Sequence, residues 1–240
     1  VGGRQDGRSV TSVEDPRAAV AATLREERKL VTVLFADLTG YTALAASLDP
    51  EEVYASLRPG ILELKRVVES FGGTVPQVLG DGFMAVFGVP AAHEDDAERA
   101  VRAALAVRER ARELRADGGR VSFPEVHAGV NSGEVIVARA DEPSGFAVIG
   151  DTVNTASRLA DLAPPGSVLV DPRTRNRTAG AIRFGRGRLR RAKGKPEGLL
   201  AYEAIEPLTP VPGGRPFGSG PFVDREAELE ALDRAFRAAV

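Results

Sequence analysis

Residues 31–42 read VTVLFADLTGYT, and the interpretation of the whole chain starts from this stretch. Its first half is rich in β-branched and other apolar residues, which is typical of a buried strand. Gly40 then predicts a tight turn, because glycine tolerates backbone conformations that other residues avoid. The strand therefore presents Asp37 at its carboxyl end. A carboxylate fixed at a strand tip beside a tight turn is suited to holding a hard cation and a phosphate.

Composition limits the class of protein. The 240 residues are 43% hydrophobic and 28% charged, which is ordinary for a soluble globular protein with one domain of about 150–200 residues and flanking segments. The net charge of −2 gives no basic field that would indicate a nucleic acid partner. The absence of cysteine excludes disulfides, zinc-thiolate sites and thiol nucleophiles. No apolar run reaches the roughly 18 residues of a membrane helix, so we expect a cytoplasmic protein with no membrane partner.

Hydrophobic periodicity and turn residues predict the elements around this strand. Leu57, Ile61, Leu64 and Val68 recur at helical spacing and should pack on a sheet. Gly80-Asp81-Gly82 between two short apolar runs predicts a hairpin whose first arm, with Pro76, lies at a sheet edge or a bulge. The expected helices cover residues 16–28, 41–48, 50–71, 90–114 and 151–163, and the other expected strands cover residues 121–130 and 134–138, paired around Asn131-Ser132-Gly133, and residues 167–171.

This order of elements predicts an α+β fold of ferredoxin-like type, with an antiparallel-rich sheet and helices on one face. We expect a linker and lead-in helix over residues 1–27, one folded domain over residues 28–206, and a Pro/Gly-rich linker over residues 207–220. Residues 221–240 then predict the truncated start of a following domain.

Four residues carry the candidate chemistry. Asp37 and Asp81 each lie where a strand ends in a turn, so neighbouring strands could place both carboxylates around a pair of divalent cations. The backbone amides of residues 38–42 could form an anion cradle. Asn154 and Arg158 are four residues apart and therefore share one helix face. Each residue alone also has a structural explanation, because Asp is common in turns and Asn with Arg on a helix is commonly solvated.

Taken together, these residues match a family. The stretches VTVLFADLTGYT, GGTVPQVLGDGFMAVF, HEDDAERAVRAAL, GVNSGEV, IGDTVNTASRL and AKGKPEGLLAYE occur in the order and spacing of the class III nucleotidyl cyclases. Residues 28–206 therefore resemble the catalytic domain of adenylate and guanylate cyclases. The resemblance implies that Asp37, Asp81 and the Leu38 carbonyl bind two Mg²⁺ or Mn²⁺ ions. It also implies that Asn154 orients the ribose and that Arg158 stabilises the transition state.

The same resemblance extends to the phosphates and to the assembly. The turn residues Thr39, Gly40, Tyr41 and Thr42 would bind phosphate, and Lys193 would contact the terminal phosphates. In such cyclases the metal aspartates come from one subunit and the Asn-Arg pair from the other, which implies a head-to-tail homodimer with two shared sites. The implied reaction is attack of the ribose 3′ oxygen on the α-phosphate of a nucleoside triphosphate, giving a 3′,5′-cyclic nucleotide and pyrophosphate.

Two positions depart from the family pattern. Gln77 stands where adenylate cyclases of this type carry a base-reading lysine, and Ala147 stands where they carry Asp or Thr. Gln both donates and accepts hydrogen bonds whereas Ala does neither, so the base should be less firmly specified. ATP is the expected substrate, since the Glu and Cys pattern of guanylate cyclases is absent too. The alternatives are a guanylate cyclase and a pseudo-cyclase that acts as a nucleotide-binding or dimerising regulatory module.

The remaining candidates receive plainer interpretations. His93 and His127 have no second histidine at ligand spacing, so both are interpreted as structural. Residues 183–195 hold seven basic residues but few aromatics, which favours a basic strand pair near the triphosphate over a nucleic acid site. Residues 222–226 (FVDRE) resemble the start of the P-loop ATPase module that follows cyclase domains in some bacterial regulators.

Overall fold

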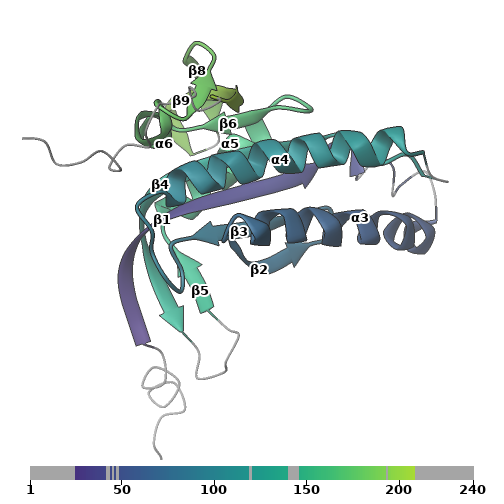
Figure 1. The fold of residues 1–240 in the computed structure, drawn as a ribbon, viewed down its shortest axis with the longest axis horizontal. Helices are drawn as coiled ribbons and strands as arrows, with labels where there is room; N and C mark the ends of the chain where they lie inside the picture. The colour runs from purple at the N-terminus through teal and green to yellow at the C-terminus, as the bar shows by residue number, and fades with distance from the viewer. Residues whose placement is uncertain are drawn as a thin grey trace, which may run out of the picture.

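The structure is a computed structural model that describes residues 25–41, 44, 46, 49–118, 121–139, 146–192 and 194–208. The predictions for residues 1–24, the linker after residue 208, and residues 221–240 lie outside this described part. The elements, drawn in Figure 1, are β1 (Arg25–Leu38), α3 (Pro50–Ser70), β2 (Thr74–Leu79), β3 (Gly82–Phe87), α4 (Asp96–Ala116), β4 (Val126–Arg139), β5 (Phe146–Ile149), α5 (Asp151–Leu162), β6 (Val168–Val170), α6 (Pro172–Thr178), β7 (Ile182–Phe184), β8 (Arg188–Ala192) and β9 (Lys195–Pro207).

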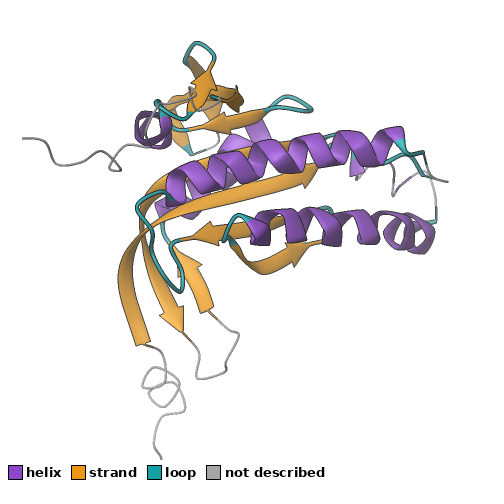
Figure 2. Cartoon of the chain, in the orientation of Figure 1, coloured by secondary structure: helices purple, strands orange, loops and turns teal. Residues whose placement is uncertain are grey.

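The sheet is built on the two 14-residue strands β1 and β4, which pair antiparallel along their full length from Arg25↔Arg139 to Leu38↔Val126. The strand order is β2-β3-β1-β4-β6-β9-β7, with β5 added to β4 and β8 added to β9. Among the described strand pairs only β4 and β6 run parallel. The predicted α+β fold with an antiparallel-rich sheet is therefore confirmed, and the long curved strands are visible in Figure 2.

Side chains alternate across β1 and so divide the core into two faces. Leu34, Ala36 and Leu38 pack in a cluster with α3 and α4, which lie side by side across one face (Figure 1). Val31 and Val33 point to the opposite face, where they join a cluster with Ala156 of α5. The prediction of helices on one face is thus wrong for α5, because the apolar residues of β1 occupy both of its faces and each face needs a cover.

Glycine decides how closely α5 approaches the sheet. A Cβ atom built on Gly129 of β4 would lie 2.2 Å from the Ala160 nitrogen and 2.3 Å from the Ala156 oxygen. The α5 backbone therefore rests directly on β4 at this point. This contact fixes where α5 lies relative to the central strands.

Several local predictions are confirmed. The four periodic residues of α3, Leu57, Ile61, Leu64 and Val68, are buried against the sheet. The helix begins at Pro50, where the Asp49 side chain accepts a hydrogen bond from the Glu51 amide. The predicted hairpin forms β2 and β3, with β2 at the sheet edge and a shift of register between Thr74 and Gln77.

Other predictions are wrong, and two of these errors arise from the pairing of β1 with β4, strands that are distant in sequence. The expected helix over residues 16–28 fails at Arg25–Arg28, which belong to β1 and pair with residues 136–139 of β4. The expected helix over residues 90–114 begins only at Asp96, after a loop in which the His93 amide donates to the Asp96 carboxylate. The turn expected at Asn131-Ser132-Gly133 does not exist, because these residues lie inside the continuous strand β4. The basic strands β7 and β8 pair with β9 rather than with each other.

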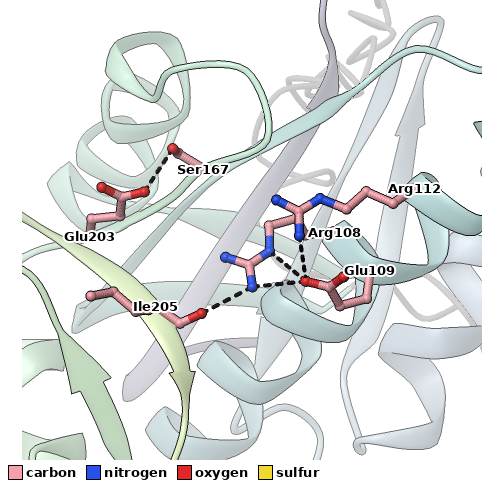
Figure 3. Close-up of polar contacts among 6 residues, drawn as sticks. All are labelled: Arg108, Glu109, Arg112, Ser167, Glu203 and Ile205. Carbon is pink, nitrogen blue, oxygen red and sulfur yellow. Dashed lines mark hydrogen bonds and ion pairs between the residues drawn. The ribbon is translucent and has the colours of Figure 1, made fainter.

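Polar contacts fasten the C-terminal strands to α4 and to β6 (Figure 3). Arg108 donates from Nη2 to the Ile205 carbonyl at 3.0 Å and to Glu109, which also accepts from Arg112. The Ser167 hydroxyl before β6 donates to Glu203 of β9 at 2.9 Å. These bonds tie β9, and with it the β8–β9 pair, to the central domain. No helix in the described ranges is long and apolar enough to cross a membrane.

Candidate functional site

Asp37 and Asp81 meet at the carboxyl end of β1. Asp37 pairs with Gly82 across β1 and β3, and the Leu38 amide donates to the Asp81 carbonyl at 2.9 Å. Gly82 is required here, since a Cβ atom at this position would lie 2.3 Å from the Ala36 carbonyl and 2.9 Å from Asp37 Oδ1. Asp37 and Asp81 both lie among the residues around one small cleft at this end of β1. The structure thus brings together the two residues that the sequence predicted to act together.

The electrostatics of this cleft suit a cation. Burial, and then the negative charge of Asp81, raise the pKa of Asp37 above its ordinary value, while His127 and the Leu38 amide oppose that shift. A divalent cation would offset this repulsion, and carboxylate oxygens are the ligands that Mg²⁺ and Mn²⁺ prefer. The described residues contain no group of three or more acidic, histidine or cysteine side chains arranged so that it could hold a metal ion. Two carboxylates alone fit a cation whose remaining ligands are backbone, water and substrate oxygens.

The turn after Asp37 offers fewer free amides than the sequence suggested. The Leu38 amide is bonded to Asp81, and the Thr39 amide donates to the Glu125 carbonyl at 2.8 Å. A phosphate cradle could therefore use only the amides of Gly40 and Tyr41 among the described residues of the turn. Gly40 has φ +74°, the left-handed conformation that favours glycine. Thr42 lies outside the described residues.

His127 lies directly opposite Asp37 in the β1–β4 pairing. Its Nε2 atom is 3.6 Å from Asp37 Oδ2, and its Nδ1 atom is 3.0 Å from the Thr39 hydroxyl. The sequence interpretation of His127 as a purely structural residue missed this contact. Only the pairing of two strands about 90 residues apart places it here, and no local pattern reports that register.

Asn154 and Arg158 lie on α5, as predicted. Asn154 is exposed, whereas Arg158 is partly buried and lies 3.9 Å from the Asp151 carboxylate. Within the described part of one chain, no hydrogen bond or ion pair joins either residue to Asp37 or Asp81. The two halves of the predicted site are therefore not linked by direct contact inside one chain.

The first turn of α5 is also connected to the start of β9. Lys195 donates to Asp151 Oδ2 at 2.9 Å, and this hydrogen bond lowers the pKa of Asp151. Gly194, at φ +75°, lies against the Arg158 guanidinium. Asp151 and Lys195 were not predicted as site residues, although both lie within the family motifs IGDTVNTASRL and AKGKPEGLLAYE. Lys193, predicted to contact phosphates, lies outside the described residues.

A cavity of about 380 Å³ opens beside this ion pair. Asp151, Thr155 and Lys195 line it together with residues of β4, α6 and β9. Asp37 and Asp81 are not among its lining residues, nor are Asn154 and Arg158. Lys195 and Asp151 are paired with each other, and none of the four predicted catalytic residues lines the cavity, so the cavity does not by itself define the site.

The two predicted base-reading positions lie on different strands. Gln77 is exposed on the edge strand β2, opposite Met84 of β3. Ala147 is exposed on β5, opposite Ala138 of β4. The strands β3, β1 and β4 lie between β2 and β5 in the sheet order. No contact between the two residues occurs in the described part of the chain.

Comparison with known proteins identifies the family. Residues 24–195, more than half of the chain, match the family described as adenylate and guanylate cyclase catalytic domain. The chain therefore belongs to this family, and it is a nucleotidyl cyclase catalytic domain. Among curated relatives, it is 32% identical over 184 residues to adenylate cyclase 1 of Rhizobium meliloti, covering 74% of this chain and 28% of that protein.

Solved structures agree with this family assignment. The guanylyl cyclase Cya2 superposes with a TM-score of 0.71 at 26% identity, covering 78% of this chain and 96% of that one. The adenylyl cyclase CyaB from P. aeruginosa has a TM-score of 0.68 at 29% identity, covering 76% and 97%. Both nucleotide specificities thus occur among similar proteins. The chain spans less than a third of the length of the curated relatives it matches most strongly.

Proposed function

We propose that this domain is an adenylate cyclase, which converts ATP to 3′,5′-cyclic AMP and pyrophosphate in a homodimer with two shared sites. The observation that carries the proposal is the meeting of Asp37 and Asp81 at the end of β1, in a chain that belongs to the cyclase family. The domain would comprise residues 28–206.

The chain's own residues have distinct roles in this reaction. Asp37 and Asp81, with the Leu38 carbonyl, would hold two Mg²⁺ or Mn²⁺ ions, which supply Lewis-acid activation of the 3′ hydroxyl and charge neutralisation at the phosphates. Asn154 orients the ribose so that its 3′ oxygen lies in line with the α-phosphorus. The 3′ oxygen bonds to that phosphorus, the bond to the pyrophosphate oxygen breaks, and the hydroxyl proton passes to solvent.

Positive side chains stabilise the charge that develops during this displacement. Arg158 lies 3.9 Å from the Asp151 carboxylate and beside Gly194, and its positive charge would stabilise an anionic transition state. Lys193 follows Ala192, the last residue of β8, and would contact the terminal phosphates. Gly40 and Tyr41 would add backbone amides, together with Thr42, while Thr39 is engaged with Glu125 and His127.

The assembly can be tested by subunit mixing. Asp37→Ala and Arg158→Ala should each abolish cyclic AMP formation, because each removes one half of both sites. If subunits exchange at random, an equal mixture should recover about a quarter of wild-type activity, since half of the dimers are mixed and each has one intact site. No recovery, with exchange verified by differently tagged subunits, would refute shared sites.

Base selectivity is the second part of the proposal. Gln77 can donate or accept a hydrogen bond and Ala147 can do neither, which supports relaxed discrimination between adenine and guanine. The test compares kcat/KM for ATP and GTP with Mn²⁺ at several protein concentrations. Strict preference for either nucleotide would overturn relaxed selectivity, and preference for GTP would indicate a guanylate cyclase. No turnover of either nucleotide would leave the pseudo-cyclase alternative.

A further inference from the structure

The two oxygens of the Asp37 carboxylate face different neighbours. Oδ1 is the oxygen nearest to Gly82 and the hairpin that carries Asp81. Oδ2 faces the imidazole of His127, 3.6 Å from Nε2. The side chain of Asp37 is 42% exposed and that of His127 is 15% exposed, so the imidazole is the more buried partner. The carboxylate thus has one oxygen toward the hairpin of Asp81 and one toward the His127 ring.

The Thr39 hydroxyl holds the other side of that ring, 3.0 Å from Nδ1. If Nδ1 accepts the hydroxyl proton, Nε2 carries its own hydrogen and directs it at the carboxylate. The opposite tautomer would place the Nε2 lone pair against the negative charge of Asp37, which is unfavourable. The negative charge of Asp37 therefore favours the tautomer whose Nε2 donates toward it, and the Thr39 hydroxyl can then donate to Nδ1.

We propose that His127 is a positioning residue that holds Oδ2 of Asp37, so that Oδ1 points toward the cation shared with Asp81. This inference deepens the proposed function, because it rests on Asp37 and Asp81 being cation ligands. Carboxylates that bind a metal are themselves held by hydrogen bonds, and loss of such a partner typically lowers metal affinity about 10- to 100-fold. The separation of 3.6 Å exceeds hydrogen-bond length, and a small rotation of the exposed carboxylate closes it.

Two substitutions separate the contact with Asp37 from the contact with Thr39. His127→Gln places an amide nitrogen near the position of Nε2 and can still donate to Asp37. His127→Asn places its amide near the position of Nδ1, so it retains a partner for Thr39 and loses the one for Asp37. His127→Leu removes both contacts while preserving approximate size.

The experiment measures binding of Mn²⁺ alone to the full 240-residue chain by electron paramagnetic resonance, without nucleotide. We expect His127→Leu and His127→Asn to raise the Kd for Mn²⁺ at least about tenfold, and His127→Gln to stay within about threefold of wild type. In cyclase assays, the Mn²⁺ concentration for half-maximal rate should shift in the same order, with KM for ATP unchanged at saturating Mn²⁺. His93→Leu is the matched control, since His93 contacts only Asp96 among described residues and should leave Mn²⁺ affinity unchanged.

The outcomes are separable. Wild-type affinity in His127→Leu overturns the inference, and so does an Asn variant that binds normally beside a Gln variant that does not, because the Thr39 contact would then be the one that matters. If Asp37→Asn binds Mn²⁺ as tightly as wild type, the cation site itself is wrong and the proposed function fails with the inference. Should His127→Leu not fold, the Gln and Asn variants still decide the question.

Discussion

Gly129→Ala should disturb the position of α5 more than any other single methyl group that could be added to β4. The added Cβ would meet backbone atoms of α5 at 2.2, 2.3 and 2.7 Å. Ordinary van der Waals contact for a Cβ begins at 3.4 Å, so α5 must move away by about 1.2 Å. Backbone atoms of a helix cannot rotate aside as a flexible side chain can, and the helix therefore moves as a unit.

The size of the effect follows from this displacement. Overpacking a well-packed core costs about 1–3 kcal/mol, and contacts with rigid backbone place Gly129→Ala near the upper end. For a domain of this size, about 3 kcal/mol lowers Tm by roughly 6–12 °C. Because α5 carries Asn154 and Arg158, a displacement of about 1 Å should also lower kcat about 100-fold.

The change in Tm is measured by thermal unfolding followed by circular dichroism. The change in kcat is measured by cyclase assays at a temperature where wild type and variant are both folded. Gly180→Ala is the matched control, because a Cβ atom built there meets nothing within 4 Å. It should unfold and turn over as wild type does. If the Tm of Gly129→Ala lies within about 1 °C of that of Gly180→Ala, the close packing of α5 on β4 is refuted. The expected effect of this packing on Asn154 and Arg158 is then refuted as well.

Three further predictions concern charge and stability. Burial and the neighbouring carboxylate raise the pKa of Asp37, so the folded state favours the protonated carboxyl group. The stabilisation from this protonated group is fully present below about pH 3.8 and is lost as pH rises through the raised pKa. Asp37→Asn should therefore raise the Tm of metal-free protein at pH 7 and leave it unchanged at pH 3.5. Arg108→Ala leaves the Ile205 carbonyl without its donor and should lower the free energy of unfolding by about 1–3 kcal/mol in urea denaturation. Lys195→Met should return the lowered pKa of Asp151 toward its ordinary value in a carboxyl NMR titration. The lowered pKa stabilises the fold above about pH 3.8, and Asp151 is exposed to solvent, so the loss of unfolding free energy at pH 7 should stay below about 1 kcal/mol and vanish in strong acid.

The parts of the fold that the sequence predicts have local causes. The α3 face of Leu57 and Leu64 repeats at helical spacing, and the β2–β3 hairpin follows from glycine on both sides of Asp81. These signals lie within a few residues of the structure they specify. Predictions for α3, the hairpin and α5 were therefore close to the observed elements.

Where the sequence misleads, distant contacts override local preference. Asn131-Ser132-Gly133 has the composition of a turn, yet Ser132 bonds to the Thr32 hydroxyl and the Asn131 amide donates to the Thr152 carbonyl. These partners satisfy the polar groups inside a buried strand, so residues 131–133 remain extended and do not form a turn. The proximity of Asp37 and Asp81 could be predicted because Asp37 lies near the end of an apolar strand and Asp81 lies between two glycines in a hairpin turn. The contact between His127 and Asp37 could not be predicted, because it depends on a strand register that no short pattern encodes.

Strand β4 connects the two halves of the proposed site through neighbouring residues. His127 contacts Asp37, while Gly129, two residues later, receives α5 with Asn154 and Arg158. If the two halves of one chain contribute to different shared sites of a dimer, mixed dimers should distinguish a substitution that damages the Asp37 half from one that damages the α5 half. Gly129→Ala damages the α5 half, so mixing it with Asp37→Ala should restore activity, whereas mixing it with Arg158→Ala should not. Recovery in both mixtures would mean that Gly129 does not act through α5, and recovery in neither would place both halves within one chain.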